Sequence, residues 1–202
     1  MKQIVLASNN AGKIIEFREI FAKFNIEIIA QNELNVPEVD EPYFTFVENS
    51  LHKARHCSKH TGLPALADDS GLCVSALNGE PSVFSARYAG EPKSDQKNID
   101  KLLDVLSNSD KRDAYFYCSL VFVRSQQDPQ PIIADGVFTG EIAKAVKGSN
   151  GHGYDPIFWL PQYNKTVAEL DSEVKNSISH RGLAIQELLK KFKMLNIINL
   201  KD

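Results

Sequence analysis

Hydrophobic and polar positions change their period several times along this chain, and each change predicts an element. An apolar run at residues 3–7 breaks at small polar residues, and apolar positions from Ile14 to Phe24 then recur at helical spacing. A second apolar run follows at residues 26–30. The pattern predicts a strand, a turn, a helix and a second strand, which favours an α/β fold.

The next part of the chain is polar and then helical. Residues 31–44 carry two prolines and an acidic set, which predicts a loop. Thr45-Phe46-Val47-Glu48 has the spacing of a capping box and predicts a helix that ends at Gly62. The inward face of this helix is expected to hold Val47, Leu51, Ala54 and Cys57 or Ser58.

An apolar run at residues 65–67 predicts a buried strand that ends at Asp68 and Asp69, in a Ser-Gly turn. Further runs follow at 72–77, 114–124, 131–139 and 157–160, with a weaker strand at 141–146, and helices are expected around Ile99–Leu106 and from about Ser177 to Leu195. The predicted architecture is a mixed α/β sheet with helices, one domain over residues 1–202 that has two lobes and a cleft.

Composition narrows the class of protein. With 43% hydrophobic and 24% charged residues, the 202-residue chain is expected to fold as a soluble globular protein. A net charge of −3 gives no broad attraction to nucleic acid, so any bound phosphate needs a local cluster of cations. Without a signal sequence or a transmembrane-length run, no membrane partner and a cytoplasmic location are expected. The three cysteines are expected to be reduced and buried.

The adjacent carboxylates Asp68 and Asp69 are the first candidate for chemistry. Two buried carboxylates need compensation by a divalent metal, a lysine or arginine, or backbone donors. Mg²⁺ is a natural candidate, since it joins one or two carboxylates to substrate phosphates. The alternative is that the pair forms an Asx turn that caps the next element.

The turn at residues 8–13 is the second candidate, because a small polar turn before a helix presents backbone N–H groups and a positive dipole end to a phosphate. Its residues are Ser8, Asn9, Asn10, Ala11, Gly12 and Lys13, and they do not meet the Walker A pattern. An ordinary β–α turn with an exposed lysine is the alternative. Glu38, Asp40 and Glu41 offer further carboxylates, or form a solvated acidic loop.

Two later segments suit an aromatic base or an anion. In Gly151-His152-Gly153-Tyr154-Asp155-Pro156, two glycines leave room for a planar group against His152 or Tyr154. Lys175 and Ser179-His180-Arg181 lie at the head of the last predicted helix, where Arg181 can fork onto a phosphate or a purine carbonyl. A structural turn and a capped helix with surface cations are the alternatives.

Six motifs in order make the chain resemble the inosine triphosphate pyrophosphatases, which hydrolyse non-standard purine nucleoside triphosphates such as ITP, dITP and XTP. They are Ser-Asn-Asn-Ala-Gly-Lys at 8–13, Thr-Phe-Val-Glu-Asn-Ser at 45–50, Ala-Asp-Asp-Ser-Gly at 67–71, Ser-Ala-Arg-Tyr-Ala-Gly at 85–90, Gly-Tyr-Asp-Pro-Ile-Phe at 153–158 and Lys-Asn-Ser-Ile-Ser-His-Arg-Gly at 175–182.

The resemblance implies a homodimeric, Mg²⁺-dependent enzyme with an elongated mixed sheet and two lobes around a nucleotide cleft. It would release a monophosphate and pyrophosphate by cleavage between the α and β phosphorus. Residues 8–13 would hold the phosphates, with Lys53 nearby, and Asp69 would bind Mg²⁺ and accept a proton from water. Glu41 or Asp40 would complete the metal site with Asp68 in support. The nucleoside would be read by Ser70, His152, Gly153, Tyr154, Asp155, Lys175, His180 and Arg181.

The chain departs from the family pattern at two places. His152 stands where the family often has an aromatic platform for the base, and the acidic segment reads Val-Asp-Glu-Pro-Tyr-Phe where a glutamate is typically followed by Thr-Gly. Two other functions compete: a septum-formation (Maf-like) nucleotide pyrophosphatase and a nucleotide sensor without hydrolysis. The His-Arg helix start and the Gly-Tyr-Asp-Pro loop disfavour the first, and the intact carboxylate set disfavours the second.

Overall fold

The computed structural model describes residues 2–198, without the side chains of residues 172, 173 and 176. In chain order, the α-helices and β-strands are β1 (Gln3–Leu6), α1 (Ala11–Ala22), β2 (Glu27–Ala30), α2 (Phe46–Thr61), β3 (Ala65–Val74), α3 (Asp95–Val105), β4 (Asp113–Val123), β5 (Ile132–Ile142), β6 (Phe158–Leu160), β7 (Lys165–Thr166), α4 (Ser172–Ile178) and α5 (His180–Met194). Short 3₁₀ helices connect several of them.

The strands form one mixed sheet in the order β2-β1-β3-β4-β5-β6-β7, which confirms the α/β fold class. β1 pairs in parallel with both β2 and β3, whereas β6 pairs antiparallel with β5 and β7. The chain divides into two compact units. The first holds residues 1–69, 119–135 and 184–202, and the second holds residues 70–118 and 136–183.

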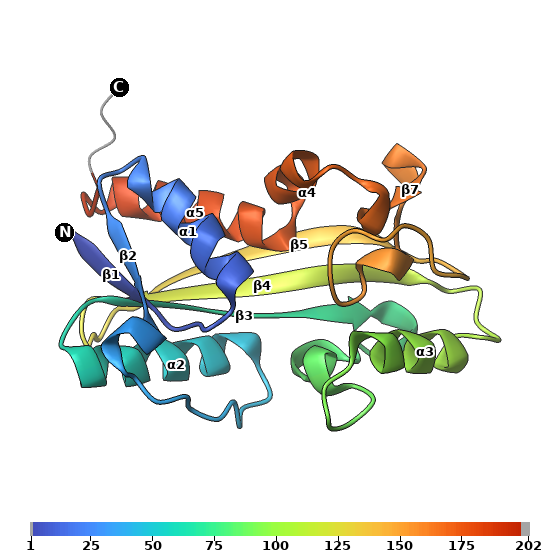
Figure 1. Ribbon diagram of the computed structural model, residues 1–202, viewed down its shortest axis with the longest axis horizontal. Coiled ribbons are helices and arrows are strands. Elements are labelled where there is room, and N and C mark those ends of the chain that lie inside the picture. Colours follow the sequence, from blue (N-terminus) through green and yellow to red (C-terminus); the bar gives the residue numbers. More distant parts are fainter. Residues whose placement is uncertain (1, 199–202) are drawn as a thin grey trace. The chain divides into compact units, whose positions relative to one another are not determined.

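The first unit contains the predicted β–α–β opening. α1 and α2 cover opposite faces of its parallel strands (Figure 1). On one face, Phe17 and Phe21 of α1 are fully buried, and Phe21 packs edge-on against Phe192 of α5. On the other face, Ala54 and Cys57 of α2 belong to a buried apolar cluster with residues of β1, β3 and β4. This packing holds the start of α1 at the end of β1.

α2 begins where the capping box predicts. The Thr45 hydroxyl accepts from the backbone N–H of Glu48, and Gly62 ends the helix with a left-handed φ of 69°. The predicted inward face is confirmed: Ala54, Cys57 and Ser58 are buried, and the half-buried Val47 and Leu51 pack against the same core cluster. Phe46, Asn49 and Ser50 are buried as well.

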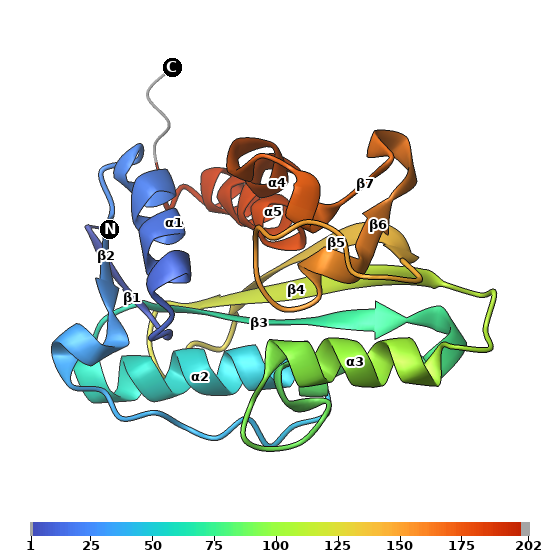
Figure 2. The ribbon, with the colours of Figure 1, turned by 45° about the vertical axis from the view of Figure 1, so that its right-hand side comes forward.

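The second unit has its own apolar core. Leu72 and Val74 of β3 lie in one buried cluster with Ile99 and Leu102 of α3 and Phe158 of β6. α3 runs below the end of β3 (Figure 2). β5 and β6 approach closely at Gly140, where a Cβ would lie 2.6 Å from the Trp159 carbonyl oxygen. A side chain there would displace the backbone of β6.

The predicted end of the third strand is wrong. β3 runs without a break from Ala65 to Val74, so Asp68 and Asp69 lie in its middle and residues 72–74 are not a separate strand. Polar residues ended the apolar run in the sequence, but strand side chains alternate between the two faces of a sheet. Each carboxylate therefore finds its own polar partner on its own face.

Two further boundaries differ from the predictions. The weaker strand at 141–146 does not exist as such, because residues 141 and 142 end β5 and no strand follows directly. The last predicted helix is two helices, since the backbone of Ser179 is extended, with φ −66° and ψ 157°. The Ser179 hydroxyl accepts from the N–H of Gly182 and caps α5. Lys175 therefore lies in α4 and not at the head of α5.

The thiols follow the prediction: Cys57, Cys73 and Cys118 are all free and buried. Within residues 2–198, no helix has the length and apolar character needed to cross a membrane.

Candidate active site

An ion pair joins the start of α1 to the middle of β3. Lys13 Nζ lies 2.7 Å from Asp68 Oδ2, and the Asp68 side chain is only 1% exposed. Because β3 extends past the last residue of β1, the side chain of Lys13 reaches over the end of β1 to the carboxylate. The compensating charge that the buried Asp68 requires is therefore a lysine.

The turn before α1 has the geometry of a helix cap. Asn10 is the N-cap residue, and its side chain accepts from the backbone N–H of Lys13 at 3.0 Å. The hydroxyl of Ser8 accepts in turn from Asn10 N–H at 3.2 Å. Ala11 and Gly12 are exposed in the first helical turn, where the helix has no acceptor for their N–H groups. This turn can therefore bind an anion.

Asp69 points to the opposite face of the strand, toward α2. Asn49 Nδ2 donates to Asp69 Oδ2 at 3.1 Å and to the carbonyl of Tyr43 at the same distance, while Asn49 Oδ1 accepts from Tyr43 N–H at 3.0 Å. Asn49 is 1% exposed. Burial raises the pKa of Asp69 to about 6 against the opposing charge of Lys53, and Glu41 and Asp68 add to the rise.

Lys53 lies among these carboxylates and is not the exposed lysine that its polar helix face suggests. Its ammonium group donates to the Glu41 carboxylate and, at 2.7 Å, to the backbone carbonyl of Asp68. Burial disfavours the charged amine, but the charges of Asp68, Glu41 and Asp69 outweigh this effect and raise the pKa of Lys53. The amine is therefore cationic at neutral pH.

The three acidic residues Glu38, Asp40 and Glu41 differ in their burial and contacts. Glu41 is half-buried and contacts Lys53, whereas Asp40 is exposed. Glu38 accepts from the side chain of Asn9 at 2.5 Å, so it holds the turn before α1. Of the two alternatives for the metal site, the geometry favours Glu41.

The carboxylates of this site suit a hard divalent cation such as Mg²⁺. Asp69 and Glu41 supply carboxylate oxygens that interact electrostatically, and Mg²⁺ takes one or two carboxylates and completes its shell with phosphate and water. Within the described residues, no group of three His, Cys, Asp or Glu side chains forms a ready-made metal cage. The carboxylates of Asp69 and Glu41 therefore fit a hard divalent cation.

In the second unit, Asp155 holds the predicted base-reading loop together. The buried Asp155 Oδ2 accepts from Lys175 Nζ at 2.6 Å and from His152 N–H at 2.9 Å. Partial desolvation and the charges of Lys175 and Arg181 lower the pKa of His152, although Asp155 and Asp95 oppose them. The imidazole is therefore neutral at physiological pH, which suits stacking on a base.

Tyr154 has a structural place in this loop. It is 4% exposed, and its hydroxyl donates to the carbonyl of Ser85 at 2.9 Å. Burial raises the pKa of this phenol further. Of the two rings flanked by glycines, only His152 is exposed to a ligand.

His180 opens α5 and is half-buried. Its ring stacks on Phe116, with centroids 5.0 Å apart and planes at 15°. Arg181 follows it and is also half-buried, and Ser70 is a half-buried residue inside β3.

Two residues with a part in these arrangements were not predicted as site residues. Asn49 could have been found because it is a polar residue on the buried face of an amphipathic helix, inside the Thr-Phe-Val-Glu-Asn-Ser motif at 45–50. Phe116 carried no such signal, since an aromatic residue in an apolar strand is ordinary core. Its contact with His180 depends on tertiary structure.

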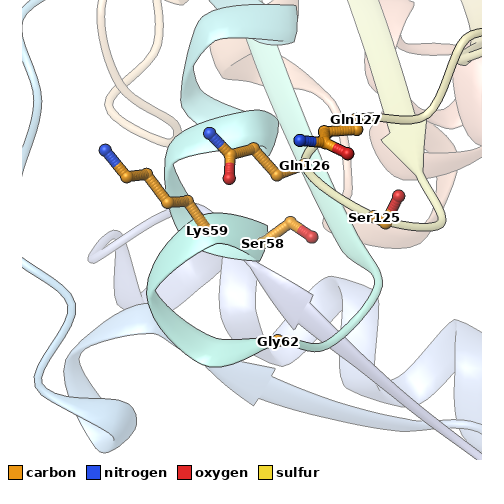
Figure 3. Close-up of a pocket in the computed structure, with 6 residues that line it drawn as sticks. All are labelled: Ser58, Lys59, Gly62, Ser125, Gln126 and Gln127. Atoms are coloured by element: carbon orange, nitrogen blue, oxygen red, sulfur yellow. The ribbon is translucent and has the colours of Figure 1, made fainter.

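A cavity elsewhere in the first unit does not coincide with any predicted site residue. It measures about 270 Å³ and lies between the C-terminal end of α2 and the turn after β4 (Figure 3). The Lys59 side chain extends away from Ser125 in this view (Figure 3). Its lining is Ser58, Lys59, Gly62, Ser125, Gln126 and Gln127.

Comparisons with known proteins identify the family of this chain. Residues 4–191 match a sequence model of the Ham1 family. The dITP/XTP pyrophosphatase of Nitrosomonas europaea is 56% identical over 190 residues, 94% of each chain. That of Coxiella burnetii is 50% identical over 190 residues, which cover 93% of this chain and 95% of the relative.

Solved structures show the same fold. A HAM1 protein from Coxiella burnetii superposes with a TM-score of 0.91 and 47% identity, covering 98% of this chain and 100% of that one. The Ham1 protein of Staphylococcus aureus gives 0.88 and 44%, covering 96% and 100%. The resemblance found in the motifs is thereby confirmed, and this chain belongs to the Ham1 family.

Proposed function

We propose that this protein hydrolyses non-standard purine nucleoside triphosphates, ITP, dITP and XTP, to the monophosphate and pyrophosphate. Relatives that are 50–56% identical over nearly the whole chain are named dITP/XTP pyrophosphatases. The single observation that carries the chemistry is the central pair on β3, in which Asp68 binds Lys13 on one face and Asp69 lies beside Lys53, Glu41 and Asn49 on the other.

The first task of such an enzyme is to hold a highly charged triphosphate. The exposed first turn of α1 supplies backbone N–H groups, and Lys13 supplies a positive charge beside them. Lys53 supplies a second cation that remains charged at neutral pH. These groups stabilise the negative charge that the leaving pyrophosphate develops. Ser8, Asn9 and Asn10 hold the turn in place, with Asn10 as the helix cap.

The second task is to activate water. Asp69 is oriented by Asn49, and its carboxylate accepts the proton of the attacking water as the bond between the α and β phosphoryl groups breaks. Asp69 and Glu41 would hold Mg²⁺. When bound, the ion would neutralise phosphate charge and lower the pKa of a bound water. Asp68 supports this arrangement through Lys13 and through its carbonyl, which accepts from Lys53.

The third task is to select the base. His152 offers a neutral ring for stacking, while Lys175, His180 and Arg181 offer donors for the 6-oxo group of hypoxanthine or xanthine. Adenine carries an amine at that position, and mismatched buried donors are costly. Gly153, Tyr154 and Asp155 shape the loop, and Ser70 adds a hydroxyl from β3.

We further propose that the enzyme works as a homodimer in the cytoplasm, a compartment that suits its free thiols.

One assay tests this function: pyrophosphate release from ITP, dITP, XTP, GTP, ATP and dTTP, with Mg²⁺ and with EDTA. We expect ITP, dITP and XTP to be preferred by at least about tenfold in kcat/KM, which is about 1.4 kcal/mol in transition-state binding. EDTA should abolish release. Asp69→Asn should lower kcat by about a hundredfold or more, since the proton acceptor is lost.

The competing functions make different predictions. A Maf-like pyrophosphatase would prefer dTTP, and a sensor would bind ITP without releasing pyrophosphate. Either result would overturn the proposal. Equal turnover by Asp69→Asn would remove that residue from the chemistry while leaving the substrate class intact.

A further inference from the structure

The loop at residues 151–155 has little structure of its own. Gly151 and Gly153 have left-handed φ values of 84° and 60°, and glycine is the residue with the largest backbone freedom to lose on ordering. Inside the loop, Asp155 N–H donates to the carbonyl of His152 at a long 3.3 Å, and His152 N–H donates to the Asp155 carboxylate. A loop of this kind needs anchors outside itself to hold one conformation.

Asp95 is such an anchor. The backbone N–H of Gly153 donates to Asp95 Oδ2 at 2.7 Å, across 58 residues of sequence. A carboxylate that accepts from a backbone N–H makes a short, charge-assisted bond, which is stronger than one between neutral groups. Asp95 thus holds the residue that directly follows His152.

The element that carries Asp95 is rigid. Asp95 is the first residue of α3, whose N-cap Ser94 accepts from Lys97 N–H at 3.4 Å. Ile99 and Leu102 of the same helix are buried in the core of the second unit. The position of the carboxylate is therefore set by the core and not by the loop that it holds.

A second connection runs from the same helix to the same loop. Asn98, 2% exposed, donates to the carbonyls of Ser85 and Ala86 and accepts from Ala89 N–H. The Ser85 carbonyl also accepts from the Tyr154 hydroxyl. One helical turn, from Asp95 to Asn98, therefore holds the loop at two consecutive residues. The Ser-Ala-Arg-Tyr-Ala-Gly motif at 85–90 therefore connects α3 to the loop at 151–155 through hydrogen bonds.

We propose that Asp95 is a positioning residue for base selection: its carboxylate fixes the Gly153 backbone and, through it, the orientation of His152 toward the nucleobase. The inference rests on the proposed function, in which this loop reads the nucleoside. It does not involve the phosphate-binding turn or the carboxylates of β3, so it concerns discrimination between bases and the KM of preferred substrates.

The test uses the full-length protein and three variants. Asp95→Ala removes the acceptor, Asp95→Asn keeps an acceptor but removes the charge, and Asp104→Ala removes an exposed carboxylate from the same helix as a control. Hydrogen exchange at the Gly153 amide reports the anchor directly. Kinetics of pyrophosphate release from ITP and ATP report base selection.

In Asp95→Ala we expect the Gly153 amide to exchange at least about tenfold faster, as the loss of one charge-assisted hydrogen bond implies. The ratio of kcat/KM for ITP over ATP should fall by about three- to tenfold, mostly through a higher KM for ITP. Asp95→Asn, which keeps a weaker, neutral acceptor, should lie between Asp95→Ala and the parent in both properties, and Asp104→Ala should match the parent.

The possible failures can be told apart. Unchanged exchange at Gly153 in Asp95→Ala would overturn the anchor, whatever the enzyme hydrolyses. Faster exchange with an unchanged ITP to ATP ratio would overturn the role in base selection. An Asp95→Asn variant as impaired as Asp95→Ala would show that charge at the start of α3 matters instead of hydrogen bonding, which also contradicts the proposal. A parent enzyme without purine discrimination would refute the proposed function and, with it, the selection role.

Discussion

Lys13 Nζ lies 2.7 Å from the buried Oδ2 of Asp68, on the face of β3 opposite to the one where Asp69 meets Asn49. Adjacent carboxylates on one strand thus have different partners because side chains alternate along a strand. Asp68 is neutralised by a lysine from the first turn of α1. Asp69 accepts from Asn49 and interacts with the charges of Lys53 and Glu41. The division of roles between two chemically identical side chains follows from strand geometry.

Lys13→Met should impair both stability and activity. The substitution keeps the length of the side chain but leaves Asp68, 1% exposed, without its cation. We expect the free energy of unfolding to fall by about 2–3 kcal/mol, because a buried carboxylate loses its ionic partner. Pyrophosphate release should fall as well, since the phosphates lose a cation. Urea unfolding and steady-state kinetics measure the two effects.

Two comparisons separate the causes. Lys13→Met combined with Asp68→Asn should recover stability but not activity, because the buried charge is gone while the phosphates still lack their lysine. Lys144→Met, which removes an ammonium 3.6 Å from the exposed Asp110, should change neither. If the double variant recovers activity, Lys13 acts only on Asp68 and does not bind phosphate.

Asn49→Ala should show that Asn49, which takes no direct part in the reaction, orients the Asp69 carboxylate. The variant removes the hydrogen bonds that Asn49 makes with the Tyr43 backbone and with Asp69. We expect a loss of about 2–3 kcal/mol in unfolding free energy from the loss of these buried hydrogen bonds. The kcat should fall by at least about tenfold because Asp69 is no longer aligned. Substitution of the exposed Asn108 by alanine is the control, and an unchanged kcat in Asn49→Ala would contradict the prediction.

Gly151 and Gly153 should differ in their tolerance of alanine. Both have left-handed φ, so either substitution costs about 1–2 kcal/mol in backbone strain. At Gly151 a Cβ would lie 2.2 Å from Asp155 Oδ2, whereas at Gly153 it meets no described atom within 4 Å. Gly151→Ala must therefore displace Asp155 from Lys175 and His152. The KM for ITP should rise in Gly151→Ala by about tenfold more than in Gly153→Ala, and equal values in the two variants would be evidence against this loop geometry.

Asp128 should make stability depend on pH. Its carboxylate accepts from the Arg124 guanidinium, and from the backbone N–H groups of Arg124 and Gln130. The hydrogen bond with the Arg124 side chain is the largest cause that lowers the pKa of Asp128 to about 2, although burial opposes it. Because the folded pKa is below the unfolded value, the carboxylate stabilises the fold above about pH 4, and this contribution is lost as the pH falls toward 2.

Asp128→Asn should accordingly lower the unfolding free energy by about 1–2 kcal/mol at pH 7, and by progressively less below pH 4. Denaturant titrations of parent and variant at pH 7, 4 and 3 measure the difference. A difference that stays constant, or grows, on acidification would mean that the hydrogen bonds and not the ionised carboxylate stabilise this turn.

Local patterns predicted those parts of the fold that depend on neighbouring residues. The β–α–β opening, the Thr45 cap and the Gly62 stop of α2 all followed from periodicity and capping chemistry. The errors lie where distant residues decide the outcome. β3 continues through Asp68 and Asp69 because Lys13 and Asn49 compensate them, and α4 ends before α5 because Ser179 becomes a cap.

The candidate site divides in the same way. The sequence by itself predicted which segments carry the candidate phosphate-binding, acidic and base-reading residues, because their motifs are contiguous and ordered. Only the tertiary structure decided that Lys53 is half-buried among carboxylates, that Glu41 and not Asp40 contacts it, and that Asp68 and Asp69 have separate partners. The physical reason is that the role of a charged side chain depends on the charges and donors around it, and for Asp68 the partner comes from a residue 55 positions away in the chain.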